Sequence, residues 1–203
     1  ESETAKLIEN IQRDLNIALI NEIFLACDKI GLDFNEVLKL ADTKWNFMKF
    51  KPGLVGGHCL PIDPYYFSHV SKIKNYNPKI ILSGRSVNEK MDNFIIKKIN
   101  QKVFKNQIIK PKILLLGATY KPNVADFRNS LSIKIYRKLN AKYKNVFIYD
   151  PYLKRSHFNG IKILKSYNEI NKFDLIVKLV KHQKIETELK KIKFNMKKLL
   201  NIF

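Results

Sequence analysis

Residues 112–120, KILLLGATY, form a short, uninterrupted apolar run that ends in a glycine turn. A run of this kind is typical of a strand that is buried on both faces of a parallel sheet. Pro111 stands just before it, where the helical spacing of apolar residues in the first half of the chain ends. The segment therefore predicts that the second half of the chain is built on a parallel sheet.

Strand and helix patterns alternate after this segment. They are an amphipathic helix at 129–143 with Asn129 or Ser130 as its cap, a strand at 145–151, a candidate third strand at 161–166 and a fourth at 173–180. Such alternation indicates βαβ units. We therefore expect an α/β fold with a Rossmann-like, doubly wound parallel sheet. Lys178 lies inside the last strand, where a lysine is costly unless it pairs or reaches solvent.

The first half of the chain has helical periodicity. The expected helices are a long one at 3–31, capped by Ser2 or Thr4 and ended by Gly31, a short one at 33–41 with Asp33 as its cap, another short one at 64–72, and a second long one at 78–108. From Leu15 to Ala26 the apolar positions run nearly all round the first helix, which predicts burial on more than one side. We divide the chain into a helical central domain, residues 1–100, and an α/β domain, residues 101–203.

Composition excludes several classes of protein. With 45% apolar residues, 13 Phe and 9 Tyr, the chain can bury a core, and no window of eighteen apolar residues predicts a membrane span. Two cysteines are too few for a disulfide framework, which favours a reducing cytoplasm. The net charge of +20 comes from lysines spread along the chain, without a basic helix interleaved with aromatic residues, so we expect no specific nucleic-acid partner.

Residues 51–66, KPGLVGGHCLPIDPYY, are the strongest candidate for a reactive site. The three glycines allow the main chain to approach a ligand closely, and Cys59 on this turn is a candidate nucleophile, with Asp63 four residues on to hold a proton. A structural turn around a buried cysteine explains the spacing equally well. A zinc site that adds His58 and His69 is less favoured, because no C-x-x-C or H-x-x-x-H pair frames it.

Two further groups of residues suggest a binding site. Lys6 and Asn10 are four residues apart and share one face of the first helix. Residues 117–130, GATYKPNVADFRNS, join a strand to a helix N-terminus, which favours anion binding, and Lys121 and Arg128 would add charge for a phosphate. The G-x-G-x-x-G fingerprint of the usual dinucleotide site does not occur in the 203 residues.

Three of these segments together resemble one family, the UDP-glucose/GDP-mannose dehydrogenases. They are ETAKLIENIQRDLNIALINE (3–22), PGLVGGHCLPIDPYY (52–66) and LLLGATYKPNVADFRNS (114–130). The resemblance implies a central domain that forms a homodimer through its first helix, followed by a UDP-binding domain. His58 before the cysteine is more similar to the enzymes that act on UDP-N-acetylhexosamines, whose products enter bacterial surface polysaccharides.

The resemblance also implies roles for individual residues. The C6 alcohol of the sugar would be oxidised twice, to a carboxylate, with two NAD⁺. Cys59 would attack the intermediate aldehyde, Asp63 would activate the water that releases the product, Lys6 would stabilise an oxyanion, and Asn10 would hydrogen-bond the sugar or that water.

Contacts with the ligands follow in the same way. The residues implied for the nucleotide sugar are Lys6, Asn10, Phe50, Pro52, Gly53, Gly56, Tyr120 and Lys121. Cys59 and Arg128 are implied on the NAD side. Because the family's NAD-binding domain has no counterpart in these residues, we expect no turnover by this chain alone. The alternative is a UDP-sugar-binding and dimerisation fragment without catalysis.

Overall fold

The chain begins with the long helix α1, Ser2–Ile30, which ends at Gly31 with a left-handed φ of 79°. The computed structural model describes residues 1–153, 160–164 and 166–203. Glycine adopts the left-handed conformation at least cost, so the predicted end of the helix is confirmed. The predicted N-terminal cap is wrong: Glu1 is the cap and makes no side-chain hydrogen bond, while Ser2 already lies inside the helix.

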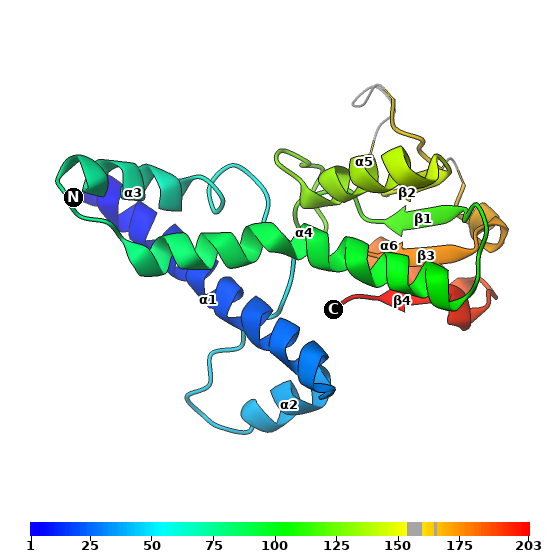
Figure 1. The fold of residues 1–203 in the computed structure, drawn as a ribbon, viewed down its shortest axis with the longest axis horizontal. Helices are drawn as coiled ribbons and strands as arrows, with labels where there is room; N and C mark the ends of the chain where they lie inside the picture. Colours follow the sequence, from blue (N-terminus) through cyan, green and yellow to red (C-terminus); the bar gives the residue numbers. More distant parts are fainter. Residues whose placement is uncertain (154–159, 165) are drawn as a thin grey trace. The chain divides into compact units, whose positions relative to one another are not determined.

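Three more helices follow before the sheet (Figure 1). They are α2, Phe34–Ala41; α3, Asp63–Ile73; and α4, Lys79–Lys105. Asp33 caps α2 as predicted, because its Oδ1 accepts the N–H groups of Asn35 at 2.8 Å and Glu36 at 3.4 Å. The helices expected in the first half of the chain are therefore present, with ends that differ by a few residues.

The structure divides into two units, Glu1–Met91 and Asp92–Phe203, and the division falls inside α4. The boundary that we placed between residues 100 and 101 lies further along the same helix. In the first unit, Cys27 is buried in a small apolar cluster with Ile20 and Phe34, as expected of a small hydrophobic residue.

The apolar stripe of α1 is buried only in part within this unit. Leu19 is 55% exposed and Ile23 is 38% exposed, whereas Ala18 and Ile20 are buried. The prediction of burial on more than one side is therefore not met by the residues of the first unit alone. The stripe leaves an apolar face of α1 open.

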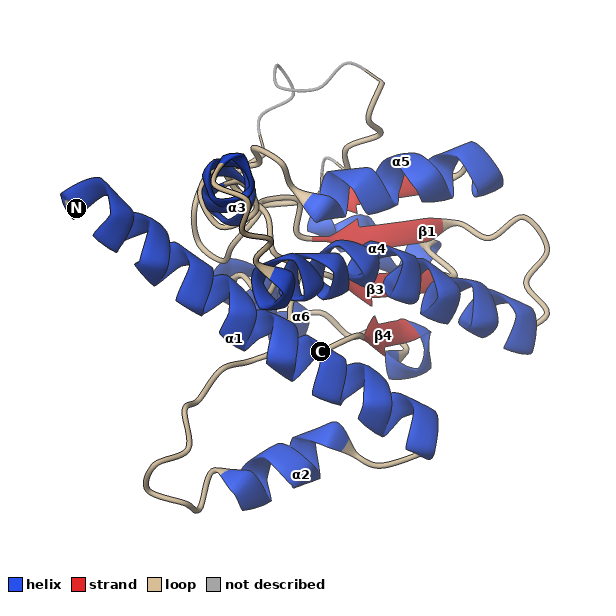
Figure 2. Cartoon of the chain, turned by 60° about the vertical axis from the view of Figure 1, so that its left-hand side comes forward, coloured by secondary structure: helices blue, strands red, loops and turns tan. Residues whose placement is uncertain are grey.

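The second unit is built on a four-stranded parallel sheet (Figure 2). Its strands are β1, Ile113–Leu116; β2, Val146–Tyr149; β3, Leu175–Lys178; and β4, Leu199–Asn201, in the order β2-β1-β3-β4. The central strand, β1, is buried along its whole length, as its continuous apolar run predicts.

Helices cover both faces of this sheet. Leu114, Leu116 and Ile176 pack with Ile185 of helix α6, Gln183–Lys191, and with the 3₁₀ helix η2, Tyr167–Lys172. Alternate residues of a strand point to opposite faces, so Ile113 and Leu115 face the other side. There α5, Leu131–Tyr143, lies beside α4 (Figure 2). The doubly wound parallel sheet predicted from the sequence is confirmed.

A buried carboxylate joins α5 to the second half of α4. Asp92 of α4 is fully buried, and Lys134 and Lys138 of α5 bring their ammonium groups to 3.0 and 2.9 Å from its Oδ2. Burial alone would raise the pKa of Asp92. The two lysines lower it by more than burial raises it, so the pKa lies below its usual value. The pair of lysines therefore keeps the carboxylate charged inside the unit.

Several local predictions for the second unit need correction. The segment 161–166 does not form a strand: Ile163 makes only an isolated bridge to Ile148, and residue 165 lies outside the described residues. Strand β4, the second 3₁₀ helix η3, Met196–Lys198, and helix α6 were not predicted. Lys178 pairs with Glu186 at 2.8 Å, which explains how a lysine is tolerated at the end of β3.

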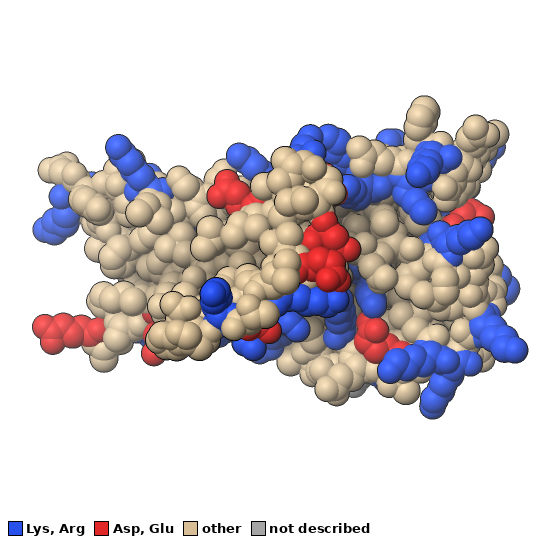
Figure 3. All heavy atoms as spheres, turned by 90° about the horizontal axis from the view of Figure 1, so that it is seen from below, with Lys and Arg blue, Asp and Glu red and all other residues tan. Residues whose placement is uncertain are grey.

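The basic side chains do not form one concentrated patch on the face that Figure 3 shows. Lysine and arginine side chains are scattered over that face, with acidic side chains between them. None of the helices within residues 1–153, 160–164 and 166–203 is both long and apolar enough to cross a membrane.

Candidate functional site

Cys59 lies on a tight turn that leads into α3. Its carbonyl oxygen accepts the N–H groups of Ile62 at 3.0 Å and Asp63 at 2.8 Å, and Asp63 is the first residue of the helix. Gly57, with a φ of 91°, supplies the left-handed conformation just before the turn. Cys59 is half-buried, whereas Cys27 is buried. The turn therefore does not place Cys59 in the core, where a purely structural cysteine would lie.

Asn10 and Asp63, 53 residues apart in sequence, are brought together. The Asn10 Nδ2 donates a hydrogen bond to Asp63 Oδ2 at 2.6 Å, which ties α1 to the start of α3. Lys6 lies one helical turn before Asn10 and is exposed. Two of the four predicted catalytic residues are therefore in direct contact, and one of them, Asp63, lies four residues after Cys59.

Sequence reasoning missed the residue that holds residues 50–56, the glycine segment, in place. The side-chain amide of Asn21 meets both main-chain groups of Gly53: its Oδ1 accepts the Gly53 N–H at 2.9 Å, and its Nδ2 donates to the Gly53 carbonyl at 3.0 Å. The amide acts toward Gly53 as a neighbouring strand would, and so fixes the main chain six residues before Cys59.

Asn21 belongs to a buried polar network with Asp14, Arg85 and Asn88, all at most 2% exposed. Asn21 Nδ2 donates to Asn88 Oδ1 at 2.9 Å, Asn88 Nδ2 donates to Asp14 Oδ1 at 2.8 Å, and Arg85 pairs with the same oxygen at 2.6 Å. Burial raises the pKa of Asp14, and the interactions with Arg85 and Asn88 offset this only in part. The network joins α1, α4 and the glycine segment.

Two signals in the sequence point to this network. Asp14 continues the four-residue spacing of Lys6 and Asn10, so it extends their face of α1. Asn21 is a polar residue inside the run ALINEIFLA, where an apolar residue would suit the surrounding stripe. A polar side chain at such a position is buried at a cost unless it has hydrogen-bond partners, and here it has three.

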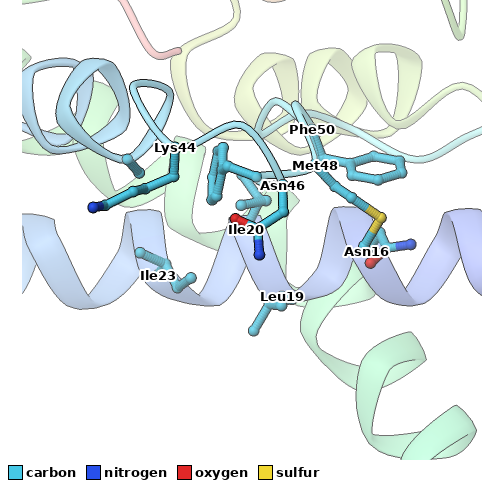
Figure 4. Close-up of a pocket in the computed structure, with 10 residues that line it drawn as sticks. Asn16, Leu19, Ile20, Ile23, Lys44, Asn46, Met48 and Phe50 are labelled. Atoms are coloured by element: carbon cyan, nitrogen blue, oxygen red, sulfur yellow. The ribbon is translucent and has the colours of Figure 1, made fainter.

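The predicted substrate residues at 50–56 follow an open pocket against α1 (Figure 4). Phe50 and Met48 line it from one side, and Leu19 and Ile23 of α1 line it from the other. Beyond Phe50, Pro52 and Gly53 are half-buried and Gly56 is buried. The segment therefore lies along α1 from the pocket to the Cys59 turn.

The second predicted ligand segment follows β1 in the other unit. Gly117 has a φ of 93°, and a Cβ there would lie 2.5 Å from the Cβ of Val180, so only glycine fits. Tyr120 is half-buried, Lys121 is exposed, and the Lys121 ammonium lies 5.5 Å from the centre of the Tyr120 ring.

Arg128 is oriented by its neighbour in the same segment. Its Nε and a terminal nitrogen bind the Asp126 carboxylate, the closest approach being 2.6 Å, and its side chain is 62% exposed. The ion pair thus orients the guanidinium at the surface before α5, where the family resemblance implies a contact on the cofactor side.

A comparison with family models covers both units. Residues 1–90 match the central domain of the UDP-glucose/GDP-mannose dehydrogenase family, and residues 114–202 match the UDP-binding domain of the same family. The chain belongs to the UDP-glucose/GDP-mannose dehydrogenase family. The glycine-and-cysteine turn thus falls in this family's central domain, and the segment after β1 falls in its UDP-binding domain.

Similar members of the family include enzymes named for UDP-N-acetylhexosamines. The UDP-N-acetyl-D-glucosamine 6-dehydrogenase of Pseudomonas aeruginosa is 45% identical over 154 residues, which are 75% of this chain and 36% of that protein. The Salmonella typhi enzyme of the same name is 38% identical over 91% of this chain and 44% of its own length. The chain spans less than half the length of these relatives.

Solved structures agree with this assignment. The UDP-D-ManNAc dehydrogenase from Pyrococcus horikoshii superposes with a TM-score of 0.80 at 32% identity, covering 98% of this chain and 47% of that one. No group of three or more His, Cys, Asp or Glu side chains within the described ranges is arranged to hold a metal ion.

Proposed function

We propose that this chain provides the catalytic cysteine and the nucleotide-binding segment of an NAD-dependent UDP-N-acetylhexosamine 6-dehydrogenase. The observation that carries the proposal is the contact between Asn10 and Asp63, at 2.6 Å, beside the turn of a partly exposed cysteine. The relatives named for UDP-N-acetyl-D-glucosamine and UDP-N-acetyl-D-mannosamine support the class of substrate.

The chemistry assigned to the first unit centres on Cys59. Its thiolate attacks the C6 aldehyde of the half-oxidised sugar to give a thiohemiacetal, removal of a second hydride gives a thioester, and water releases the carboxylate and the thiol. Asp63, oriented by Asn10, accepts a proton from that water, and the Lys6 ammonium stabilises negative charge on the C6 oxygen. Covalent capture keeps the reactive aldehyde from leaving between the two oxidations.

The cofactor and the nucleotide are assigned to separate groups of residues. NAD⁺, when bound, supplies the hydride acceptor, and of the described residues Cys59 and Arg128 would face it. Lys121 offers positive charge to the diphosphate, and Tyr120 offers an aromatic ring. The remaining proposed sugar-nucleotide contacts come from the segment fixed by Asn21, namely Phe50, Pro52, Gly53 and Gly56.

The two free cysteines fit a reducing, cytoplasmic setting.

Alkylation of Cys59 tests the catalytic part of the proposal. We expect iodoacetamide to modify Cys59 near neutral pH, and UDP-N-acetylglucosamine or UDP-N-acetylmannosamine to slow that modification, as followed by peptide mass spectrometry. Cys27 is 5% exposed and serves as the internal control, since it should stay unmodified while the chain is folded. Cys59→Ser should remove the signal, and GDP-mannose should not protect.

The same experiment separates catalysis from binding alone. If calorimetry detects binding of the UDP-sugar while the alkylation rate of Cys59 stays unchanged, the chain is a binding fragment and the catalytic proposal is wrong. If Cys59 is protected only by the UDP-sugars, the thiol lies at the ligand.

We also propose that the chain forms a homodimer through α1. Ile8, Leu19 and Ile23 are 55%, 55% and 38% exposed and lie on about the same face of the helix, because eleven and fifteen residues complete roughly three and four turns. Exposed apolar residues on one helix face favour pairing with a second copy. Sedimentation equilibrium that finds only monomers at micromolar concentration would contradict the proposal.

A further inference from the structure

A fully buried histidine lies where three strands of the second unit end. His182 precedes α6 and is 0% exposed. Its ring contacts Asp150, which follows β2, and Thr119, which follows β1. The carboxyl ends of parallel strands lie at one edge of a sheet, and this edge is where the Tyr120 and Lys121 segment emerges.

The hydrogen bonds assign the state of the His182 ring. The main-chain N–H of Asn123 donates to Nδ1 at 3.0 Å, so Nδ1 carries no proton and the proton is on Nε2. Nε2 lies 3.0 Å from Asp150 Oδ2 and 3.0 Å from Thr119 Oγ1. Both ring nitrogens are therefore used. Nδ1 accepts a hydrogen bond from Asn123, and Nε2 donates toward Asp150 Oδ2 and Thr119 Oγ1.

The segment from 118 to 123 is held at several main-chain groups by these same residues. Asp150 Oδ2 accepts the N–H of Ala118 at 2.6 Å and that of Thr119 at 3.2 Å, and the Thr119 hydroxyl donates to the Lys121 carbonyl at 3.0 Å. Burial raises the pKa of Asp150, but hydrogen bonds from His182 and Ala118 lower it below its usual value, so Asp150 stays an acceptor.

The far end of the segment is fixed by His182 together with α6. Asn123 has a φ of 60°, in the left-handed region, and its Oδ1 accepts the N–H of Gln183, the first residue of α6, at 2.9 Å. Without the bond from its own N–H to His182, Asn123 would have one anchor fewer in a conformation that residues other than glycine adopt only uncommonly, although asparagine tolerates it best. The imidazole thus joins both ends of the segment to one point.

We propose that His182 is a positioning residue for nucleotide binding, which holds residues 118–123 in the arrangement that presents Tyr120 and Lys121 to the uridine diphosphate. This inference rests on the proposed function, in which that segment binds the nucleotide. A segment that is ordered before the ligand arrives loses less conformational entropy on binding, so release of the segment should weaken binding without removing any contact residue.

UDP affinity, measured by calorimetry on the 203-residue chain, tests the inference through a matched pair of variants at Thr119. Thr119→Val keeps the volume and removes the hydroxyl that links the His182 ring to the Lys121 carbonyl. Thr119→Ser keeps that hydroxyl. We expect Thr119→Val to weaken UDP binding by about tenfold and Thr119→Ser to bind within about threefold of the wild type.

A second pair of variants addresses His182 itself. His182→Asn can place its amide oxygen near the Nδ1 position and so accept from Asn123, whereas His182→Ala cannot. We expect His182→Ala to bind UDP at least about tenfold more weakly, with faster amide exchange confined to residues 118–123, and His182→Asn to recover part of the affinity. If His182→Ala does not fold, the Thr119 pair decides.

The outcomes distinguish this inference from the proposed function. If the wild type does not bind UDP, the proposed function of the second unit is wrong and the inference fails with it. If the wild type binds UDP and Thr119→Val binds as tightly as Thr119→Ser, His182 and its partners do not position the segment. Faster exchange throughout the sheet, with unchanged UDP affinity, would assign His182 a purely structural role and overturn the inference.

Discussion

Replacement of Asn21 by alanine is the sharpest test of the buried polar network in the first unit. Asn21 makes three hydrogen bonds, two to Gly53 and one to Asn88. The Asn88 Oδ1 is buried and would lose its donor, which costs about 1–3 kcal/mol. Gly53 is only half-buried, so water can replace part of its two bonds, which contribute about 0.5–1.5 kcal/mol each. We expect Asn21→Ala to lower the free energy of unfolding of the first unit by about 2–5 kcal/mol.

The assay has a global and a local part. Urea unfolding followed by circular dichroism gives the stability, and amide exchange at Gly53 reports the bond to Asn21 Oδ1 directly. A loss of about 2 kcal/mol corresponds to about thirtyfold faster exchange where opening controls the rate. Asn16→Ala is the matched control, because Asn16 is a half-buried asparagine on the same helix and outside the network.

The result that would refute the reasoning is specific. If Asn21→Ala unfolds within about 0.5 kcal/mol of Asn16→Ala and the Gly53 amide stays protected, the network does not hold the glycine segment. If the variant is destabilised as expected, the alkylation rate of Cys59 should also change, because the main chain that leads to the turn is no longer fixed.

Two further predictions concern charge and assembly. Lys134 and Lys138 keep the folded-state pKa of Asp92 below its usual value, so the stabilisation by Asp92 is present above the unfolded-state pKa of about 3.9 and is lost as the pH falls through the folded-state pKa. Asp92→Asn should therefore lower the urea midpoint at pH 7 and flatten its acid dependence; an unchanged pH profile would contradict this. Leu19→Glu should weaken homodimerisation by more than about tenfold in sedimentation equilibrium, whereas Ile109→Glu, an exposed apolar residue of the other unit, should leave it unchanged.

Local features of the sequence were sufficient to predict most of the elements. Strand β1 could be predicted from the apolar run before Gly117, because a strand buried on both faces needs apolar residues at every position. Asp33 gave the start of α2 because the cap is a contact between residues two and three apart. Both signals act within a few residues, so they are readable without the tertiary structure.

The elements that the sequence did not reveal lack such local signals. Strand β4 has three residues, and its pairing with Ile176 and its neighbours is set by the sheet rather than by its own pattern. Helix α6, QKIETELKK, is mostly polar and buries mainly Ile185. The position of α6 depends on the face of the sheet that it packs against, and the apolar periodicity of a short polar helix is weak.

The candidate site shows the same limit in its polar contacts. The spacing of Lys6 and Asn10 indicates a shared face, but the partner of Asn10 is 53 residues away, and Gly53 lies 32 residues from Asn21. Hydrogen bonds over such separations depend on how elements pack, which is why Cys59 and Asp63 could be predicted from their own segment, whereas Asn21, which holds Gly53, could not.

The two segments that we propose to bind ligand are organised by one physical principle. In each, a buried side chain that is committed to hydrogen bonds, Asn21 in one unit and His182 in the other, fixes the main chain, while the residues proposed to meet ligand, apart from the buried Gly56, are partly or fully exposed. Because a buried polar group without partners is costly, each anchor is stable only with its segment in one arrangement. Loss of an anchor should therefore disorder a segment whose contact residues are intact, and loss of a contact residue such as Lys121 should weaken binding while the segment stays ordered. The two kinds of residue can be told apart by measuring affinity and amide exchange on the same variants.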